Sequence, residues 1–217
     1  MEVASTGRVR ETILSRKPRR NSKHAAGLTV LIVAAVSVAA WLNGAALLPR
    51  LAATGVEIYE QHEYWRLLTA VAVHADLLHL FSNILFLAVL SYLLYGYYGF
   101  WVYPMLCLAL AVLTNYLTLL SYPLRTSLVG ASGLVYCMAG FWLSMYLAVD
   151  RSLSVGKRIM RAVAIVIVLL LPTRYEGNVS YRSHAIGFGL GAVAGLGYFQ
   201  RKRGMIRKAE VLEMEDW

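Results

Sequence analysis

Charged side chains are scarce in this 217-residue chain. Asp, Glu, Lys and Arg make up 15% of it, whereas about a quarter is usual in a soluble domain. Apolar residues reach 59% and stand in blocks long enough to cross a bilayer as helices. This pattern excludes a soluble globular protein and predicts an all-α protein with several membrane-spanning helices.

Cysteine is also rare. The two cysteines, Cys107 and Cys137, lie inside apolar blocks, so they indicate neither a disulfide framework nor a metal motif. The formal net charge of +9 could suggest a nucleic-acid partner, but the basic residues stand at the ends of apolar blocks, where they report membrane topology. We therefore expect buried thiols, no nucleic-acid partner and no cofactor.

Six apolar blocks follow a basic segment at residues 1–25, which we expect to be a loosely ordered tail. A helix needs about 20 residues to cross roughly 30 Å of hydrocarbon. The predicted spans are residues 27–48, 77–96, 101–121, 129–149, 159–172 and 183–199. They make one membrane domain at residues 26–200, in which residues 49–76 form a long outer loop partly embedded in the bilayer. Residues 201–217 are expected to be a second tail.

The basic residues predict the orientation of these spans. If both termini are cytoplasmic, 16 of the 21 Lys and Arg residues lie inside and five lie outside. Basic segments favour the cytoplasmic side of a membrane. We therefore expect six spans with both termini in the cytoplasm, in a bacterial inner membrane.

Polar side chains at similar depth in three predicted spans form the candidate site. His79 and Asn83 lie in the second span, Ser132 in the fourth and His184 in the sixth. At about 1.5 Å per residue, all four fall in the outer third of the membrane. Polar groups inside spans are costly and therefore indicate function. His79 and Asn83 are also four residues apart, so they share one helical face.

Glycines are placed to let the fourth and sixth spans approach each other. Gly187 and Gly191 follow His184 at helical spacing, and Gly130 and Gly133 lie at the start of the fourth span. Faces of small residues let two membrane helices pack closely. Such a contact would bring the serine and the histidine within hydrogen-bonding reach, as a nucleophile and its base require.

Taken in chain order, these residues match the motifs of one family. The motifs are Trp65-Arg66, His74 with His79 and Asn83, Gly130-Ala131-Ser132-Gly133 with Tyr136, and His184 with Gly187 and Gly191. Across nearly all of residues 55–199 the chain resembles a rhomboid intramembrane serine protease. The resemblance implies the minimal, six-helix form of that bundle.

The resemblance also implies a role for each residue. Ser132 would attack the scissile carbonyl, and His184 would take its proton and return it to the leaving amine. The ring of Tyr136 would pack on the histidine, in place of the carboxylate of a triad. The Ser132 backbone N–H and the side chains of His79 and Asn83 would form the oxyanion hole.

His74 and Asp76 lie beside this site and could suggest a metal. His74 and His79 are five residues apart, about 140° around a helix, so they do not share a face as a ligand pair at i and i+4 would. We therefore expect no metal site. Because His74 lies off the face of the proposed oxyanion donors, we expect it to matter mainly for stability.

The substrate that the resemblance implies is a single-pass membrane protein, unwound near the outer face, because a helical backbone keeps its carbonyls hydrogen-bonded. Two alternatives lie close to this family: a non-catalytic rhomboid-like protein that grips membrane helices, and a specialised rhomboid that processes the C-terminal anchors of exported proteins. The non-catalytic relatives typically lack the serine or the histidine, which this chain keeps. A small transporter fits less well, because the inner halves of the helices are almost wholly apolar.

Overall fold

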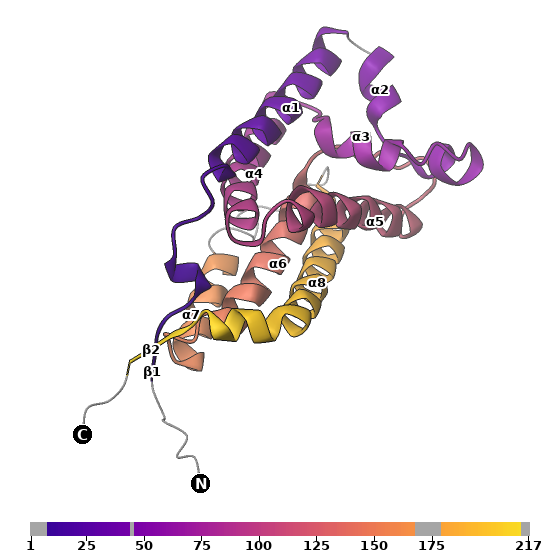
Figure 1. Cartoon of the computed structure of the whole chain (residues 1–217). Helices are drawn as coiled ribbons and strands as arrows, with labels where there is room; N and C mark the ends of the chain where they lie inside the picture. The colour runs from indigo at the N-terminus through magenta and orange to yellow at the C-terminus, as the bar shows by residue number, and fades with distance from the viewer. Residues whose placement is uncertain (1–7, 44–45, 168–178, 214–217) are drawn as a thin grey trace.

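The computed structural model describes residues 8–43, 46–167 and 179–213, and they are mostly helical (Figure 1). The longer helices are α1 (Ser22–Leu42), α4 (Leu77–Tyr98), α5 (Cys107–Leu120), α6 (Ser132–Val149), α7 (Val155–Ile165) and α8 (Tyr181–Lys208). A π-helical segment, η4 (Trp101–Leu106), leads into α5.

Four helical segments of the described chain are long and apolar enough to cross a membrane. They are Ser22–Leu42, Leu77–Tyr98, Trp101–Leu120 and Ser132–Val149. These segments match the first four predicted spans, although α1 begins and ends earlier than expected. It ends at Leu42 because the side-chain amide of Asn43 donates a 2.7 Å hydrogen bond to the Ala39 carbonyl and caps the last turn.

The last two predicted spans correspond to α7 and α8. Helix α7 begins at Val155, before the predicted start, and residues 168–172 of the span expected at 159–172 lie outside the described residues. Helix α8 continues past residue 200 to Lys208, so the first part of the expected C-terminal tail is helical.

From residue 8 on, the N-terminal segment is not the loosely ordered tail that we expected. Strand β1 (Arg8–Glu11) pairs antiparallel with β2 (Val211–Glu213), and one 3-10 turn, η1 (Ile13–Ser15), follows β1. The Arg16 guanidinium adds a 2.8 Å hydrogen bond to the Ala209 carbonyl. In the described residues this two-stranded ribbon is the one sheet, and it joins segments at the two ends of the described chain.

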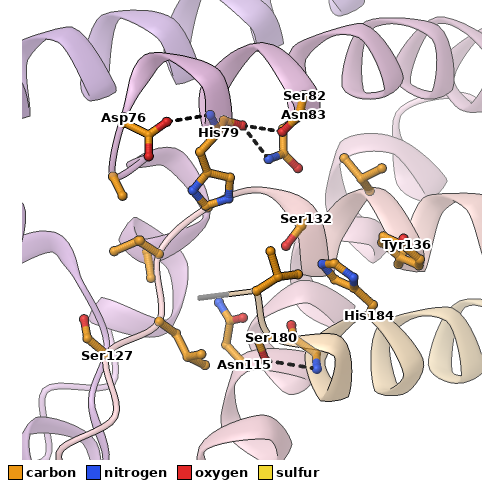
Figure 2. Close-up of a pocket in the computed structure, with 18 of the residues that line it drawn as sticks. Asp76, His79, Ser82, Asn83, Asn115, Ser127, Ser132, Tyr136, Ser180 and His184 are labelled. Carbon is orange, nitrogen blue, oxygen red and sulfur yellow. Dashed lines mark hydrogen bonds between the residues drawn. The ribbon is translucent and has the colours of Figure 1, made fainter. Parts of the chain in front are cut away.

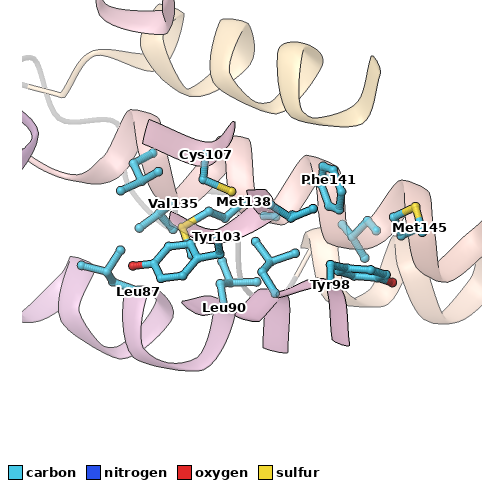
Figure 3. Close-up of a cluster of buried hydrophobic side chains, with 14 of the residues drawn as sticks. Leu87, Leu90, Tyr98, Tyr103, Cys107, Val135, Met138, Phe141 and Met145 are labelled. Carbon is cyan, nitrogen blue, oxygen red and sulfur yellow. The ribbon is translucent and has the colours of Figure 1, made fainter. Parts of the chain in front are cut away.

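Helix α6 is the centre of the bundle. Inside the protein, 67% of its 18 residues are buried, against 22% of the most apolar 18-residue stretch of α1. Met138 and Phe141 of α6 are fully buried and belong to one apolar cluster with Leu87 and Tyr98 of α4 (Figure 3). The rings of Tyr98 and Phe141 meet edge to face, with their centroids 5.6 Å apart.

The predicted outer loop lies at the end of the molecule opposite the β1–β2 ribbon (Figure 1). It folds into three short helices, α2 (Leu47–Leu51), η3 (Val56–Glu60) and α3 (Arg66–Ala72). The Arg66 guanidinium ties α3 to α2, because it donates to the carbonyls of Pro49 and Arg50 at 2.7 and 2.6 Å, and it pairs with Glu63 between η3 and α3. Backbone hydrogen bonds from Leu128 to Ala53 and from Gly130 to Ala70 attach the segment before α6 to this loop.

Candidate active site

Ser132 is the first residue of α6 and is half-buried. The segment before it is held by the outer loop, because the Gly130 N–H donates a 2.8 Å hydrogen bond to the Ala70 carbonyl of α3. Gly130 has a φ of +108°, which glycine adopts without the strain that a side chain would bring. The N-terminus of a helix carries a partial positive charge, so Ser132 lies where a developing negative charge is stabilised.

His184 lies in the first turn of α8 and is half-buried. Its ring stacks on the ring of Tyr136, with centroids 4.0 Å apart and planes 7° from parallel. The Tyr181 ring meets it edge-on, with centroids 5.9 Å apart. Two aromatic contacts therefore restrain the plane of the imidazole.

The start of α8, and with it His184, is fixed against the end of α5. The Ser180 hydroxyl caps α8 by accepting the Ser183 N–H at 3.3 Å, and it also donates to the Tyr122 hydroxyl at 3.4 Å. The Arg182 guanidinium lies over the Tyr122 ring, 4.7 Å from its centroid. A capping serine three residues before Ser183 is a helix-start signal that the sequence reading did not use.

Helices α6 and α8 are in backbone contact, as the glycine pattern predicted. A Cβ atom added to Gly191 would lie 1.9 Å from the Cys137 carbonyl oxygen, and one added to Gly187 would lie 2.5 Å from that of Gly133. A Cβ on Gly133 would lie 2.7 Å from the Ser183 hydroxyl. No side chain fits at Gly187 or Gly191 without moving one of the helices, and one at Gly133 would displace the Ser183 side chain.

The predicted site residues line one cavity of about 540 Å³ (Figure 2). Ser132 and Tyr136 reach it from α6, His184 from α8, and His79 and Asn83 from α4. Its volume lies within the range of about 300–1,000 Å³ that is usual for ligand pockets. Between the described side chains of Ser132 and His184 the structure shows no hydrogen bond, and such bonds are often long until substrate binds.

His79 and Asn83 share a face of α4, as predicted, and they border the segment that leads to Ser132. The His79 ring lies directly over Gly130, where an added Cβ would be 2.6 Å from Nε2. The buried Asn83 amide donates one N–H to the His79 carbonyl of its own helix at 2.9 Å. An amide carries two N–H groups, so the second can serve a ligand in the cavity.

His74 makes a contact that the sequence reading missed. Its Nε2 accepts the backbone N–H of Ala131 at 3.1 Å, and its Nδ1 lies 3.1 Å from the Ser37 hydroxyl of α1. Burial of the ring, followed by the nearby His79, lowers the pKa of His74 to about 4, so the ring is neutral near pH 7. His74 precedes α4, so the helical spacing of the sequence could not predict this contact.

Asn115 also lines the cavity, although its partner could not be named from the sequence. Its amide donates a 2.9 Å hydrogen bond to the Leu67 carbonyl. Asn115 therefore ties α5 to α3 and supports the wall of the cavity.

The fold and the cavity define a polytopic, helical membrane protein with a cluster of polar residues among its helices. A family model, the Rhomboid domain, matches residues 61–201. The match covers more than half of the chain and includes every residue of the candidate site. The chain belongs to the rhomboid family, whose members are integral membrane proteins related to intramembrane proteases. No curated protein matches the chain in sequence.

Proposed function

We propose that this protein is an intramembrane serine endopeptidase that cleaves membrane-spanning segments with Ser132 as nucleophile and His184 as base. The observation that carries the proposal is the convergence of both residues on one cavity at the N-terminus of α6. His184 is restrained by Tyr136, and the proposed oxyanion donors border the same space. Membership of the rhomboid family supports this chemistry.

In the proposed reaction the Ser132 hydroxyl attacks the scissile carbonyl carbon while His184 takes its proton. The tetrahedral oxyanion accepts hydrogen bonds from the Ser132 backbone N–H and from the side chains of His79 and Asn83. His184 then protonates the leaving amine, and an acyl-enzyme remains. Water, deprotonated by His184, hydrolyses the ester and restores the serine.

The proposed topology has six spans and two cytoplasmic termini, in a bacterial inner membrane. Pairing of β1 with β2 supports an even number of spans, because it puts the two ends of the described chain on one side. The excess of basic residues supports that side being the cytoplasm. With this orientation the cavity faces the outer half of the bilayer.

The proposed substrate is a single-pass membrane protein whose spanning helix unwinds near the outer face. A helical backbone buries its carbonyls in hydrogen bonds, so attack by Ser132 requires an extended segment in the cavity.

Cleavage of a purified single-pass substrate in liposomes tests the pairing of nucleophile and base. Ser132→Ala and His184→Ala should each abolish cleavage, and the double variant should be no worse than either, because the two act as one unit. Ser144→Ala is a matched control, since this buried serine of α6 bonds only the Phe141 carbonyl in its own helix at 2.9 Å.

Substantial activity in either single variant, with a further loss in the double variant, would contradict the pairing. Binding of the substrate helix by an inactive wild type would instead identify a non-catalytic rhomboid-like protein. Cleavage restricted to the C-terminal anchors of exported proteins would identify a specialised processing enzyme.

Asn83→Ala tests the proposed oxyanion hole. The Asn83 amide would stabilise negative charge that develops on the carbonyl oxygen only in the transition state. Its loss should therefore lower kcat by roughly 10- to 1,000-fold while KM changes little. The thermal midpoint in detergent is measured on the same preparation. Unchanged kcat per folded molecule would remove Asn83 from the oxyanion hole and leave it a purely structural role.

A further inference from the structure

A chain of buried hydrogen bonds leads from α1 to the residue before the proposed nucleophile. The Ser37 hydroxyl lies 3.1 Å from His74 Nδ1 and 3.1 Å from the Ala72 carbonyl oxygen. At the other edge of the ring, His74 Nε2 lies 3.1 Å from the backbone nitrogen of Ala131. Ser37 and His74 are both 0% exposed, so water does not compete for these bonds.

The direction of each bond in this chain follows from chemistry. A backbone N–H can only donate, so Nε2 of His74 must be the unprotonated nitrogen that accepts from Ala131. In the neutral ring Nδ1 then carries the proton and donates to Ser37, and the Ser37 hydroxyl donates its own proton to Ala72. Every donor has one acceptor, and only one tautomer of the ring fits.

Helix α1 fixes the position of the ring as well as its tautomer. The Trp41 indole N–H, one turn after Ser37, donates a 2.8 Å hydrogen bond to the His74 carbonyl. Neither Ser37 nor Trp41 lines the cavity, and α1 contributes no residue to it. The hydrogen bonds of Ser37 and Trp41 therefore link α1 to the site through His74.

His74 contacts two parts of the proposed machinery. It accepts from Ala131, which caps the start of α6 directly before Ser132. Its ring also meets the ring of His79 edge to face, with centroids 5.0 Å apart. A displacement of His74 would therefore move both the nucleophile and a proposed oxyanion donor.

We propose that Ser37 and His74 are positioning residues, and that the Ser37–His74–Ala131 hydrogen-bond chain holds Ser132 and His79 in reactive geometry. The proposal rests on the proposed function. It assigns His74 more than the stabilising role expected from the sequence, and it gives α1 a part in catalysis from outside the cavity.

Two amide substitutions at position 74 separate the two ends of the chain. In His74→Gln the side-chain oxygen reaches the place of Nε2 and can accept the Ala131 N–H. In His74→Asn the shorter side chain reaches only the place of Nδ1, so the Ser37 bond is kept and the Ala131 bond is lost. Ser37→Ala removes the acceptor at Nδ1.

Ser91→Ala is the matched control for Ser37→Ala. Ser91 is a serine of α4 that is also 0% exposed, and its hydroxyl donates to the Leu87 carbonyl of its own helix at 2.6 Å. Ser91 does not line the cavity. A loss that came only from removing a buried hydroxyl would appear equally in both variants.

The first measurement is kcat and KM for cleavage of a single-pass substrate in liposomes, per folded molecule. His74→Asn should lower kcat by about 10- to 100-fold at nearly constant KM, since small misplacements of reacting groups cost up to about 100-fold. His74→Gln keeps the Ala131 bond but has no partner for Ser37, so His74→Gln and Ser37→Ala should each lose about 3- to 10-fold. Equal kcat values in the Asn and Gln variants, or in Ser37→Ala and Ser91→Ala, would overturn the proposal.

The second measurement does not depend on activity. Nitrogen-15 NMR of labelled histidine in micelles, assigned by comparison with His74→Gln, should show His74 with its proton on Nδ1. A proton on Nε2 would overturn the hydrogen-bond chain even in an active enzyme. An inactive wild type would overturn the proposed function instead. The tautomer of His74 would then be the only test of the hydrogen-bond chain.

Discussion

Helices α1 and α6 are both apolar enough to cross a membrane, but they use their surfaces in opposite ways. Helix α1 is the more hydrophobic of the two, and yet 22% of its most apolar 18-residue stretch is buried in the protein, against 67% for α6. Its exposed side chains, such as Leu28 and Leu31, are suited to lipid. Helix α6 instead has glycines where α8 touches it, and it carries Ser132.

The difference shows that in this protein hydrophobicity marks exposure to lipid rather than the core. Lipid tails are as apolar as leucine, so apolar area alone does not drive two membrane helices together. Close fit does, and α6 achieves it through backbone contacts with α8. The site lies on the tightly packed pair, and the buried Ser37 and the Trp41 indole of α1 bond His74 at its edge.

The largest expected effect is on the α6–α8 contact. In Gly191→Ala the new Cβ would lie 1.9 Å from the Cys137 carbonyl oxygen, and backbone atoms cannot move aside as a flexible side chain can. We expect a loss of more than about 3 kcal/mol in stability, measured by unfolding in detergent. Cleavage should be lost with it.

Gly189→Ala is the control for this substitution. Gly189 lies on the same helix with nothing within 4 Å of an added Cβ, so the change should be neutral or slightly stabilising. Equal losses at both positions would mean that helix flexibility, and not close approach, explains the glycines.

The second expected effect concerns the link between α1 and the site. The pKa of His74 is lowered to about 4 from 6.5. Between these pH values the unfolded chain binds a proton that the native ring does not. Stability should therefore be full above about pH 6.5 and fall as the pH drops toward 4, by at most about 3 kcal/mol. His74→Gln should lose this part of the pH dependence, which is measured as the slope of the thermal midpoint against pH.

A His74→Gln variant with the same slope as wild type would contradict this prediction. Other groups that titrate in this range contribute equally to both proteins, so the comparison of slopes isolates His74.

Hydropathy and the spacing of polar residues were enough to predict four of the spans and the residues that meet in the cavity. Long-range main-chain pairing was not predictable in this way, because β1 and β2 are short and lie at opposite ends of the described chain. The role of Ser37 was hidden for a different reason. A single serine in an apolar helix usually bonds its own backbone, and only the fold shows that His74 lies beside it.

The smallest expected effect separates the two faces of α1. Val33 is 5% exposed and packs in the core, whereas Leu31 is 65% exposed. Val33→Ala should cost about 1 kcal/mol through lost packing, and Leu31→Ala should stay within about 0.5 kcal/mol because lipid replaces the missing contacts. Unfolding of the two variants in one detergent measures the difference. A larger loss at Leu31 would indicate that this face packs against protein rather than lipid.

The β1–β2 ribbon has a consequence for how the protein is made. β1 precedes all of the helices and β2 follows them, so β1 is synthesised long before its partner exists. Its hydrogen-bonding edge must stay unpaired while every helix between the two strands is made and inserted. Closure of the ribbon is then a late event in biogenesis, and it can occur only in chains whose last helix has already reached the correct side of the membrane.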